Sequence, residues 1–175
     1  MGNHINELIM AEITLKGSPI QTNGNLPATG TAMADFKLVG ADLSEVGLDK
    51  FEGKKKVLNI FPSVDTGTCA TSVRTFNQKA SDLDNTVVLC ISRDLPFAQS
   101  RFCGAEGIEN VHMLSDFVDG HFGKNNGLEI TTGPLKGLHS RCIIVLDEAN
   151  KVVYTEQVAE TVNEPDYEAA IQHLG

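Results

Sequence analysis

The spacing of apolar residues from position 57 onward predicts a strand, a helix and a second strand. Residues 57–61 form an apolar run of strand length. The next stretch is amphipathic, with apolar side chains at helical spacing at Val73, Phe76, Ala80 and Leu83. Residues 86–91 form a continuous apolar run, typical of a central strand that is covered on both faces. This order of elements predicts a parallel crossover unit.

The second half of the chain continues the alternation. Residues 96–107 predict a short helix, and residues 111–114 predict a strand. Two apolar runs, 142–146 and 152–154, flank a polar turn and predict an antiparallel hairpin. A last helix is expected to begin near Pro165, with an apolar stripe at Tyr167, Ala170, Ile171 and Leu174. Parallel and antiparallel pairs together predict an α/β domain with a mixed sheet.

The N-terminal part has a different pattern. Residues 13–16 alternate as a strand and residues 36–39 do so again, which suggests an N-terminal β-hairpin or arm. The stretch between them, 17–30, is rich in Gly, Pro, Asn and Thr and is interpreted as turns. Residues 1–9 precede a second methionine and are interpreted as a leader or a cloning remnant. A single domain is therefore expected over residues 10–175.

Composition and charge narrow the function. Hydrophobic residues make up 41% and charged residues 21% of the 175 residues, as in typical globular domains. The net charge of −9 disfavours a protein that must neutralise a phosphate backbone, so no nucleic-acid partner is expected. The one basic run, Lys54 to Lys56, directly precedes a predicted strand and is interpreted as a solvated surface.

The sequence lacks the patterns that are typical of membrane spans, secretory signals and metal sites. No apolar run reaches the roughly 18 residues that a membrane span needs, and no secretory signal pattern begins the chain. A cytoplasmic protein without a membrane partner is expected. The cysteines have no zinc-site spacing and the histidines are scattered, which predicts no metal site. The four cysteines are Cys69, Cys90, Cys103 and Cys142.

The loop that follows residues 57–61 carries the most informative chemistry. Cys69 falls at the first turn of the next helix, where unpaired backbone N–H groups and the helix dipole favour an anion. Cysteines at helix starts near cations have pKa values of ~3.5–7.5, against about 8.5 for a free thiol. A thiolate at Cys69 is therefore expected to attack the terminal oxygen of a peroxide and to become a sulfenic acid.

Two further residues of this loop fit the same chemistry. Thr66 lies three residues before Cys69, so its hydroxyl is expected to bond the thiolate or a peroxide oxygen. Pro62 is expected to shape the loop and to shield the sulfur. Taken alone, Thr66 is also typical of a helix cap, and Pro62 is typical of a strand end.

The residues Pro62, Thr66 and Cys69 match the Pro-x-x-x-Thr-x-x-Cys signature of peroxiredoxins. Residues 59–66 and 69–77 around them resemble the bacterial thiol peroxidases, the atypical two-cysteine subgroup of that family. The resemblance runs from about residue 13 to the C-terminus. It implies a thioredoxin-like fold, with a central mixed β-sheet flanked by helices and an N-terminal β-hairpin. It also implies that Cys69 is the peroxidatic cysteine.

The resemblance implies further roles. Cys103 matches the resolving cysteine, which forms an intramolecular disulfide with Cys69, and Arg141 matches the active-site arginine. The implied substrates are hydrogen peroxide and organic hydroperoxides, the implied reductant is thioredoxin, and the implied assembly is a homodimer. No metal, haem or flavin cofactor is implied. Two sulfurs bond only when their Cα atoms approach within about 7 Å, so the first turn after Thr66 or the segment around Cys103 is expected to unwind during the cycle.

The remaining cysteines and histidines have simpler interpretations. Cys90 lies in an apolar run and Cys142 alternates with Arg141 along a strand, so both are predicted to be core residues. His139 is interpreted as an exposed loop residue. Sequence does not bring any of the five histidines to Cys69 as the base that a cysteine hydrolase needs.

Other functional classes fit the sequence less well. A cysteine phosphatase has five residues between its Cys and Arg, whereas four separate Cys69 from Arg74. A thiol–disulfide oxidoreductase of the thioredoxin type usually needs a Cys-x-x-Cys pair, which this sequence does not contain. A redox sensor or binding module that uses the same two cysteines stays open. Rapid catalytic consumption of peroxide distinguishes the enzyme from such a sensor.

Overall fold

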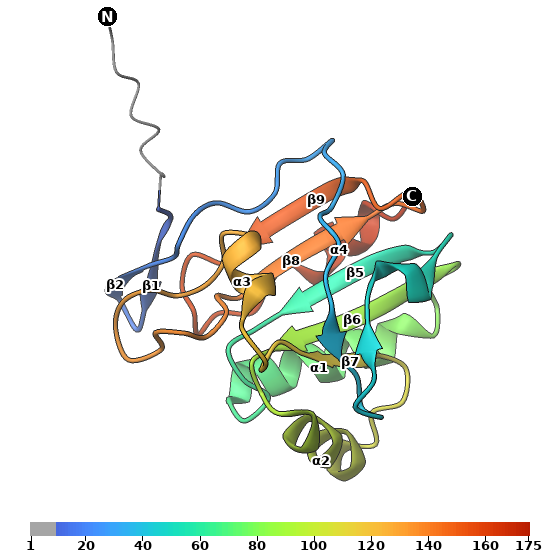
Figure 1. The fold of residues 1–175 in the computed structure, drawn as a ribbon, viewed down its shortest axis with the longest axis horizontal. Helices are drawn as coiled ribbons and strands as arrows, with labels where there is room; N and C mark the ends of the chain where they lie inside the picture. Colours follow the sequence, from blue (N-terminus) through green and yellow to red (C-terminus); the bar gives the residue numbers. More distant parts are fainter. Residues whose placement is uncertain (1–9) are drawn as a thin grey trace, which may run out of the picture.

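The computed structural model describes residues 10–175, and the leader interpreted at residues 1–9 lies outside the described residues. A seven-stranded sheet, with strand order β4-β3-β7-β6-β5-β8-β9, forms its centre (Figure 1). Its strands are β3 (Leu38–Val39), β4 (Glu45–Val46), β5 (Lys55–Ile60), β6 (Thr86–Ser92), β7 (His112–Ser115), β8 (Cys142–Leu146) and β9 (Val152–Gln157). Pairs β5–β6 and β6–β7 are parallel, whereas β5–β8 and β8–β9 are antiparallel. The predicted mixed sheet is confirmed.

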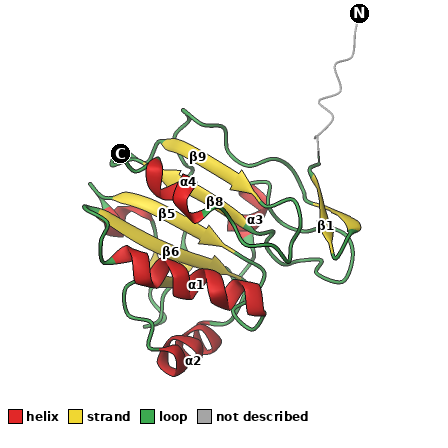
Figure 2. Ribbon diagram, turned by 180° about the vertical axis from the view of Figure 1, so that it is seen from behind, coloured by secondary structure: helices red, strands yellow, loops and turns green. Residues whose placement is uncertain are grey.

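Helices cover both faces of the sheet. Figure 2 shows α1 and α4 on one face, and α3 lies on the other. The helices are α1 (Gly67–Ala80), α2 (Pro96–Glu106), α3 (His121–Asn125) and α4 (Tyr167–Gln172), together with the short 3-10 helix η1 (Leu48–Phe51). The sequence predicted α1, α2 and α4 but not α3 or η1, which are too short for a helical repeat of apolar residues to show.

Two apolar clusters form the main core, one on each face of the sheet. Leu58 and Ile60 of β5 belong to the cluster that contains Phe122 of α3. Val57, on the same strand, belongs to the cluster that contains Phe76 of α1. This alternation follows from the two-residue repeat of a β-strand, and it fixes which side chains of β5 lie under α1.

The N-terminal hairpin is present, but its second strand was placed wrongly. β1 (Glu12–Leu15) pairs with β2 (Ser18–Gln21), which lies inside the stretch interpreted as turns. Lys16 and Gly17, between the two strands, have φ values of 50° and 82°. Two positive φ values in a two-residue loop are typical of the tight turn that joins hairpin strands. The strand predicted near residue 38 instead joins the main sheet as β3, beside β4 and β7.

Lys56 corrects a second prediction, because the structure buries it completely instead of leaving it in solvent. Its strand β5 lies between β6 and β8, where Lys56 pairs with Val87 and Leu146. The ammonium group donates to Lys54 O at 2.9 Å and to Asn150 Oδ1 at 2.6 Å. Desolvation lowers the pKa of Lys56. The basic run is thus partly a structural contact with the β8–β9 turn.

Within residues 10–175, no helix is long and apolar enough to cross a membrane.

Candidate active site

The loop between β5 and α1 places Cys69 in the first turn of α1, as predicted. Thr66 is the N-cap residue, with extended backbone angles, and Cys69 is the third residue of the helix. Cys69 is fully buried. The Thr66 hydroxyl donates to Ser63 O at 3.1 Å, so it closes the loop rather than capping the helix. Pro62 lies two residues after the end of β5 and is buried.

Asp94 holds this loop in place, and sequence reasoning did not identify it. Its carboxylate accepts hydrogen bonds from Ser63 Oγ at 2.7 Å and from the Val64 N–H at 2.9 Å. It also accepts one from Ser92 Oγ at 2.6 Å, at the end of β6. A charged acceptor with three donors fixes a loop more firmly than neutral contacts do. An acidic residue two positions after a buried strand was the available sequence signal.

Arg141 lies next to the Cys69 sulfur. It directly precedes β8, where Cys142 pairs with Ile60 at the end of β5. Its Nη2 donates to Cys69 Sγ at 3.3 Å, and Nε and Nη2 both donate to Thr161 O at 3.0 Å. Nη1 is buried and has no hydrogen-bond partner among the described residues. The sulfur of a helix-start cysteine is therefore beside a buried cation that retains a free donor.

A cavity of about 770 Å³ adjoins these residues. Pro62, Thr66, Arg141 and Thr161 line one part of it. The rest of the wall is largely apolar and comes from the N-terminal hairpin and two loops, through Leu15, Ile20, Pro134, Leu135 and Val162. The hairpin thus forms one wall of a cavity that has polar groups beside Cys69 and apolar groups farther along.

Cys103 lies on α2 and is not joined to Cys69 by a hydrogen bond or a disulfide in this structure. It is half-buried and lines a different cavity, of about 390 Å³, together with Phe51 and Met113. Burial raises the pKa of Cys103. Two ion pairs, Asp65–Arg101 and Arg74–Glu106, link the region around α1 to α2. Cys103 packs against the same apolar cluster that contains Cys69, although it lines a different cavity from the one beside Arg141.

Cys90 and Cys142 are core residues, as predicted. Both are fully buried, and burial raises the pKa of each thiol to about 12. Cys142 belongs to the apolar cluster on the face opposite the one that contains Cys69. The expected alternation between Arg141 and Cys142 is thus confirmed. Thiols with such a high pKa have almost no thiolate at neutral pH.

The prediction that His139 is exposed was wrong, since its side chain is buried. Its Nε2 lies 2.8 Å from Asp116 Oδ2, another buried side chain. A carboxylate partner supplies what a buried imidazole needs, and the sequence does not show this pairing because the two residues are 23 positions apart. His139 has no hydrogen bond to Cys69 in this structure, and Asp116 is the partner of its Nε2.

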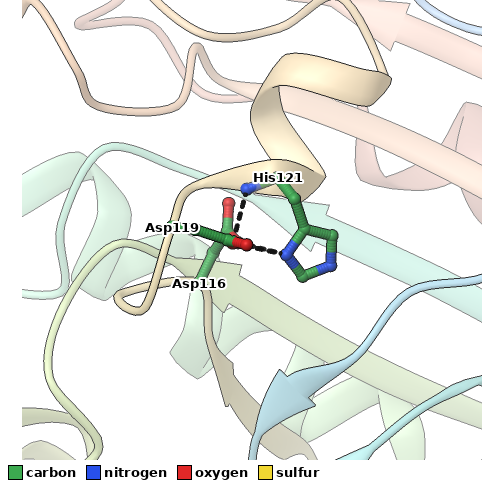
Figure 3. Close-up of side chains that lie close together, drawn as sticks. All are labelled: Asp116, Asp119 and His121. Atoms are coloured by element: carbon green, nitrogen blue, oxygen red, sulfur yellow. Dashed lines mark hydrogen bonds and ion pairs between the residues drawn. The ribbon is translucent and has the colours of Figure 1, made fainter.

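Asp116 also lies near Asp119 and His121, and Figure 3 shows the three side chains together at the start of α3. The His121 Nδ1 is 2.7 Å from Asp119 Oδ1, and its Nε2 accepts a hydrogen bond from the Lys37 N–H at 3.2 Å. Asp116 accepts hydrogen bonds from the Phe122 and Gly123 N–H groups. These contacts anchor the first turn of α3. The three side chains therefore have a structural role that explains why they lie together.

Arg74, the arginine of the phosphatase alternative, is occupied elsewhere. Its Nε and Nη2 donate to the two carboxylate oxygens of Glu106 at 2.9 and 3.1 Å. The contact is a bidentate pair between α1 and α2, and it raises the pKa of Arg74 and lowers that of Glu106. Arg141, rather than Arg74, is the arginine that donates to Cys69.

The family model described as Redoxin matches residues 28–171 of this chain, which is most of its length. The chain belongs to the redoxin family. This redoxin is 54% identical over 165 residues to the thiol peroxidase of Corynebacterium glutamicum, and the match covers 94% of this chain and 99% of that protein. The resemblance to thiol peroxidases that the sequence motif indicated is therefore confirmed.

Solved structures agree with this assignment. A peroxiredoxin-like protein from Aquifex aeolicus superposes with a TM-score of 0.87 at 34% identity, over 93% of this redoxin and 95% of that chain. The thiol peroxidase from Chromobacterium violaceum superposes with a TM-score of 0.84 at 26% identity, over 90% and 92% of the two chains. The redoxin thus has the predicted thioredoxin-like fold and is a peroxidase enzyme of the peroxiredoxin type.

Proposed function

We propose that the chain reduces hydroperoxides with Cys69 as the attacking sulfur and Arg141 as the group that binds the peroxide. The observation that carries this proposal is the 3.3 Å contact between Arg141 Nη2 and Cys69 Sγ, with Nη1 left as an unpartnered donor beside the cavity. A guanidinium presents donors in a fixed fork, so one nitrogen bonds the sulfur while another bonds a peroxide oxygen. The Thr66 hydroxyl and the Pro62 ring complete this end of the cavity.

The first chemical step follows from these roles. The Cys69 thiolate attacks the terminal peroxide oxygen, the O–O bond breaks, and the sulfur becomes a sulfenic acid. The other oxygen leaves as hydroxide or alkoxide and takes a proton to become water or an alcohol. The apolar wall around Leu15, Ile20 and Leu135 supports organic hydroperoxides as substrates alongside hydrogen peroxide.

Cys103 is the proposed resolving cysteine. Its thiolate attacks the Cys69 sulfenic acid, releases water and leaves an intramolecular disulfide, which thioredoxin then reduces. Because Cys103 lines a cavity other than the one beside Cys69, the first turn of α1 or the segment around Cys103 is expected to unwind for the sulfurs to meet. The cytoplasmic location predicted from the sequence stays a prediction.

This unwinding predicts a difference in hydrogen exchange. Amides of residues 66–72, or of residues 100–107, are expected to exchange faster in the disulfide form than in the reduced form, because their helical hydrogen bonds are broken. Exchange followed by mass spectrometry on both forms measures this, with β5 and β8 as internal controls. Equal protection of both segments in the two forms would count against the proposed movement.

The peroxidase proposal is tested by a thioredoxin-coupled assay on the wild type and on Cys103→Ser. The wild type is expected to consume hydrogen peroxide catalytically. Cys103→Ser is expected to react about once per chain and then to accumulate sulfenic or more oxidised Cys69, because no second thiol resolves it. Mass spectrometry of the intact variant identifies that product. Slow, stoichiometric oxidation of the wild type would instead indicate a redox sensor.

A homodimer is proposed through an exposed apolar patch made by Leu95, Phe97, Phe117 and Val118. Phe97 is 67% exposed and Val118 is 70% exposed. Leu95 and Phe97 lie at the start of α2, and Phe117 and Val118 lie in the loop after β7. These two segments follow β6 and β7, which pair in parallel up to Ser92 and Ser115. Exposed apolar groups that gather in one place are typical of protein–protein contacts.

Replacing Phe97 with glutamate is expected to shift the chain toward monomer, because a charge placed in the apolar contact must be desolvated. Sedimentation velocity over a concentration series measures the shift. Leu43→Glu is the matched control, since Leu43 is 55% exposed but lies in the turn between β3 and β4. A wild type that stays monomeric throughout the series contradicts the proposal.

A further inference from the structure

The side chain of Thr161 has an unexplained hydroxyl beside the active site. Thr161 follows β9 and is only 3% exposed. Its Oγ1 is buried and has no hydrogen-bond partner among the described residues. Leaving a buried hydroxyl without a partner is unfavourable, so such groups are rare and call for a reason.

The backbone of Thr161, in contrast, is fully used. Its N–H donates to Thr14 O at 2.8 Å, in the N-terminal hairpin. Its carbonyl oxygen accepts two hydrogen bonds from Arg141, each at 3.0 Å. These contacts fix the position of Thr161 next to the guanidinium that also bonds Cys69. The side chain is thus held at one place relative to the sulfur.

Thr161 also lines the same cavity as Pro62, Thr66 and Arg141. In residues 10–175, six buried side-chain nitrogen or oxygen atoms have no partner, and two of them belong to residues that line this cavity. Those two atoms are Arg141 Nη1 and Thr161 Oγ1. They come from residues that contact one another directly, because Arg141 Nε and Nη2 both donate to Thr161 O.

We propose that Thr161 is a further catalytic residue, whose hydroxyl donates a hydrogen bond to the leaving oxygen of the peroxide. The proposal rests on the proposed role of Cys69. As the sulfur–oxygen bond forms and the O–O bond breaks, the electron pair moves to the leaving oxygen. The terminal oxygen and its hydrogen stay on sulfur as the sulfenic acid, and the leaving oxygen takes a proton from water. Thr161 keeps its own proton and stabilises the developing charge.

Thr161→Val tests this, because it removes the hydroxyl but keeps the backbone carbonyl that positions Arg141. The rate constant for Cys69 oxidation by hydrogen peroxide is expected to fall about 5- to 20-fold, the loss of one hydrogen bond worth roughly 1–2 kcal/mol. Thr161→Ser is expected to stay within about 2-fold of the wild type, since it retains the hydroxyl. Stopped-flow kinetics with one equivalent of peroxide measures the first step alone.

The leaving group separates a catalytic role from a merely structural one. Hydroxide and alkoxide are strongly basic leaving groups, so their developing charge needs stabilisation. The carboxylate released by a peroxy acid is a weak base and needs much less stabilisation. Thr161→Val is therefore expected to lose most of its rate with hydrogen peroxide and tert-butyl hydroperoxide and little with peracetic acid. Thr86→Val is the control for removing a threonine hydroxyl. Thr86 is the first residue of β6 and does not line the cavity beside Arg141, so its substitution is expected to change none of these rates.

Two outcomes would overturn the proposal. Either Thr161→Val reacts as fast as the wild type, or it loses the same factor with all three oxidants, as general damage to the site does. Both leave the proposed role of Cys69 intact, provided that the wild type is oxidised at Cys69. Failure of the wild type to react at Cys69 with any of the three oxidants would instead remove the proposed function itself.

Discussion

Cys69→Ser is expected to lose peroxide turnover completely. A serine hydroxyl stays protonated at neutral pH and does not cycle between a thiolate and a sulfenic acid, so no two-electron reduction of the peroxide is available. The rate is expected to fall by at least roughly 10³-fold, the scale on which the loss of an essential nucleophile acts. The thioredoxin-coupled consumption of hydrogen peroxide measures this.

The matched control is Cys142→Ala. Cys142 is the cysteine next to Arg141 in sequence but is fully buried on the opposite face of the sheet. Its removal is expected to lower the melting temperature and to leave the turnover of the folded protein nearly unchanged. If Cys69→Ser keeps turning over peroxide while Cys142→Ala is folded and inactive, the assignment of the attacking sulfur is wrong.

Arg141→Lys is expected to give the second largest effect. Lysine keeps the positive charge, but it lacks the planar guanidinium that bonds Thr161 O and Cys69 Sγ at the same time. It also lacks a group in the place of Nη1, the unpartnered donor of Arg141. The rate constant for Cys69 oxidation is expected to fall about 10²- to 10³-fold, the usual cost of removing one preorganised donor from a transition state. Single-turnover kinetics at several peroxide concentrations measures it.

Arg74→Lys serves as the control for this substitution. Arg74 lies five residues after Cys69 but bonds Glu106 on the surface between α1 and α2. Such an exposed pair contributes little, so the rate is expected to change less than about 2-fold. Equal losses in Arg74→Lys and Arg141→Lys would mean that charge near the helix, rather than the fork of Arg141, sets the rate.

Several parts of the fold were readable from the sequence because local patterns determine them. The apolar runs of β6 and β8 are long enough to identify buried strands, and Phe76 lies at helical spacing within α1. The position of Cys69 follows from the boundary between a strand and a helix. These features depend on residues that are close together in the chain.

The errors came from contacts between distant residues. Lys56 looked like a surface lysine, and its burial depends on Asn150, 94 positions later. His139 looked like a loop residue, and Asp116 makes its burial possible. A short polar segment such as Ser18–Gln21 shows little strand pattern on its own, because its pairing with β1 and its contact with the cavity define it.

The residues of the candidate site also fall into a group that a local motif identifies and a group that only tertiary contacts define. Cys69, Thr66 and Pro62 share one loop, so a motif identifies them together. Asp94 and Thr161 act through tertiary contacts, with Ser63 in one case and with Arg141 in the other. An acidic residue after a strand, such as Asp94, gives a weak signal in the sequence, but a single sequence does not show which distant residue it contacts.

The most direct test of the account is to add one equivalent of hydrogen peroxide to the reduced wild type and to map its peptides without reduction. The account predicts one cross-linked product, in which the peptide that contains Cys69 is joined to the peptide that contains Cys103, while Cys90 and Cys142 stay as thiols. Oxidation at Cys90 or Cys142 with Cys69 left unmodified would contradict it.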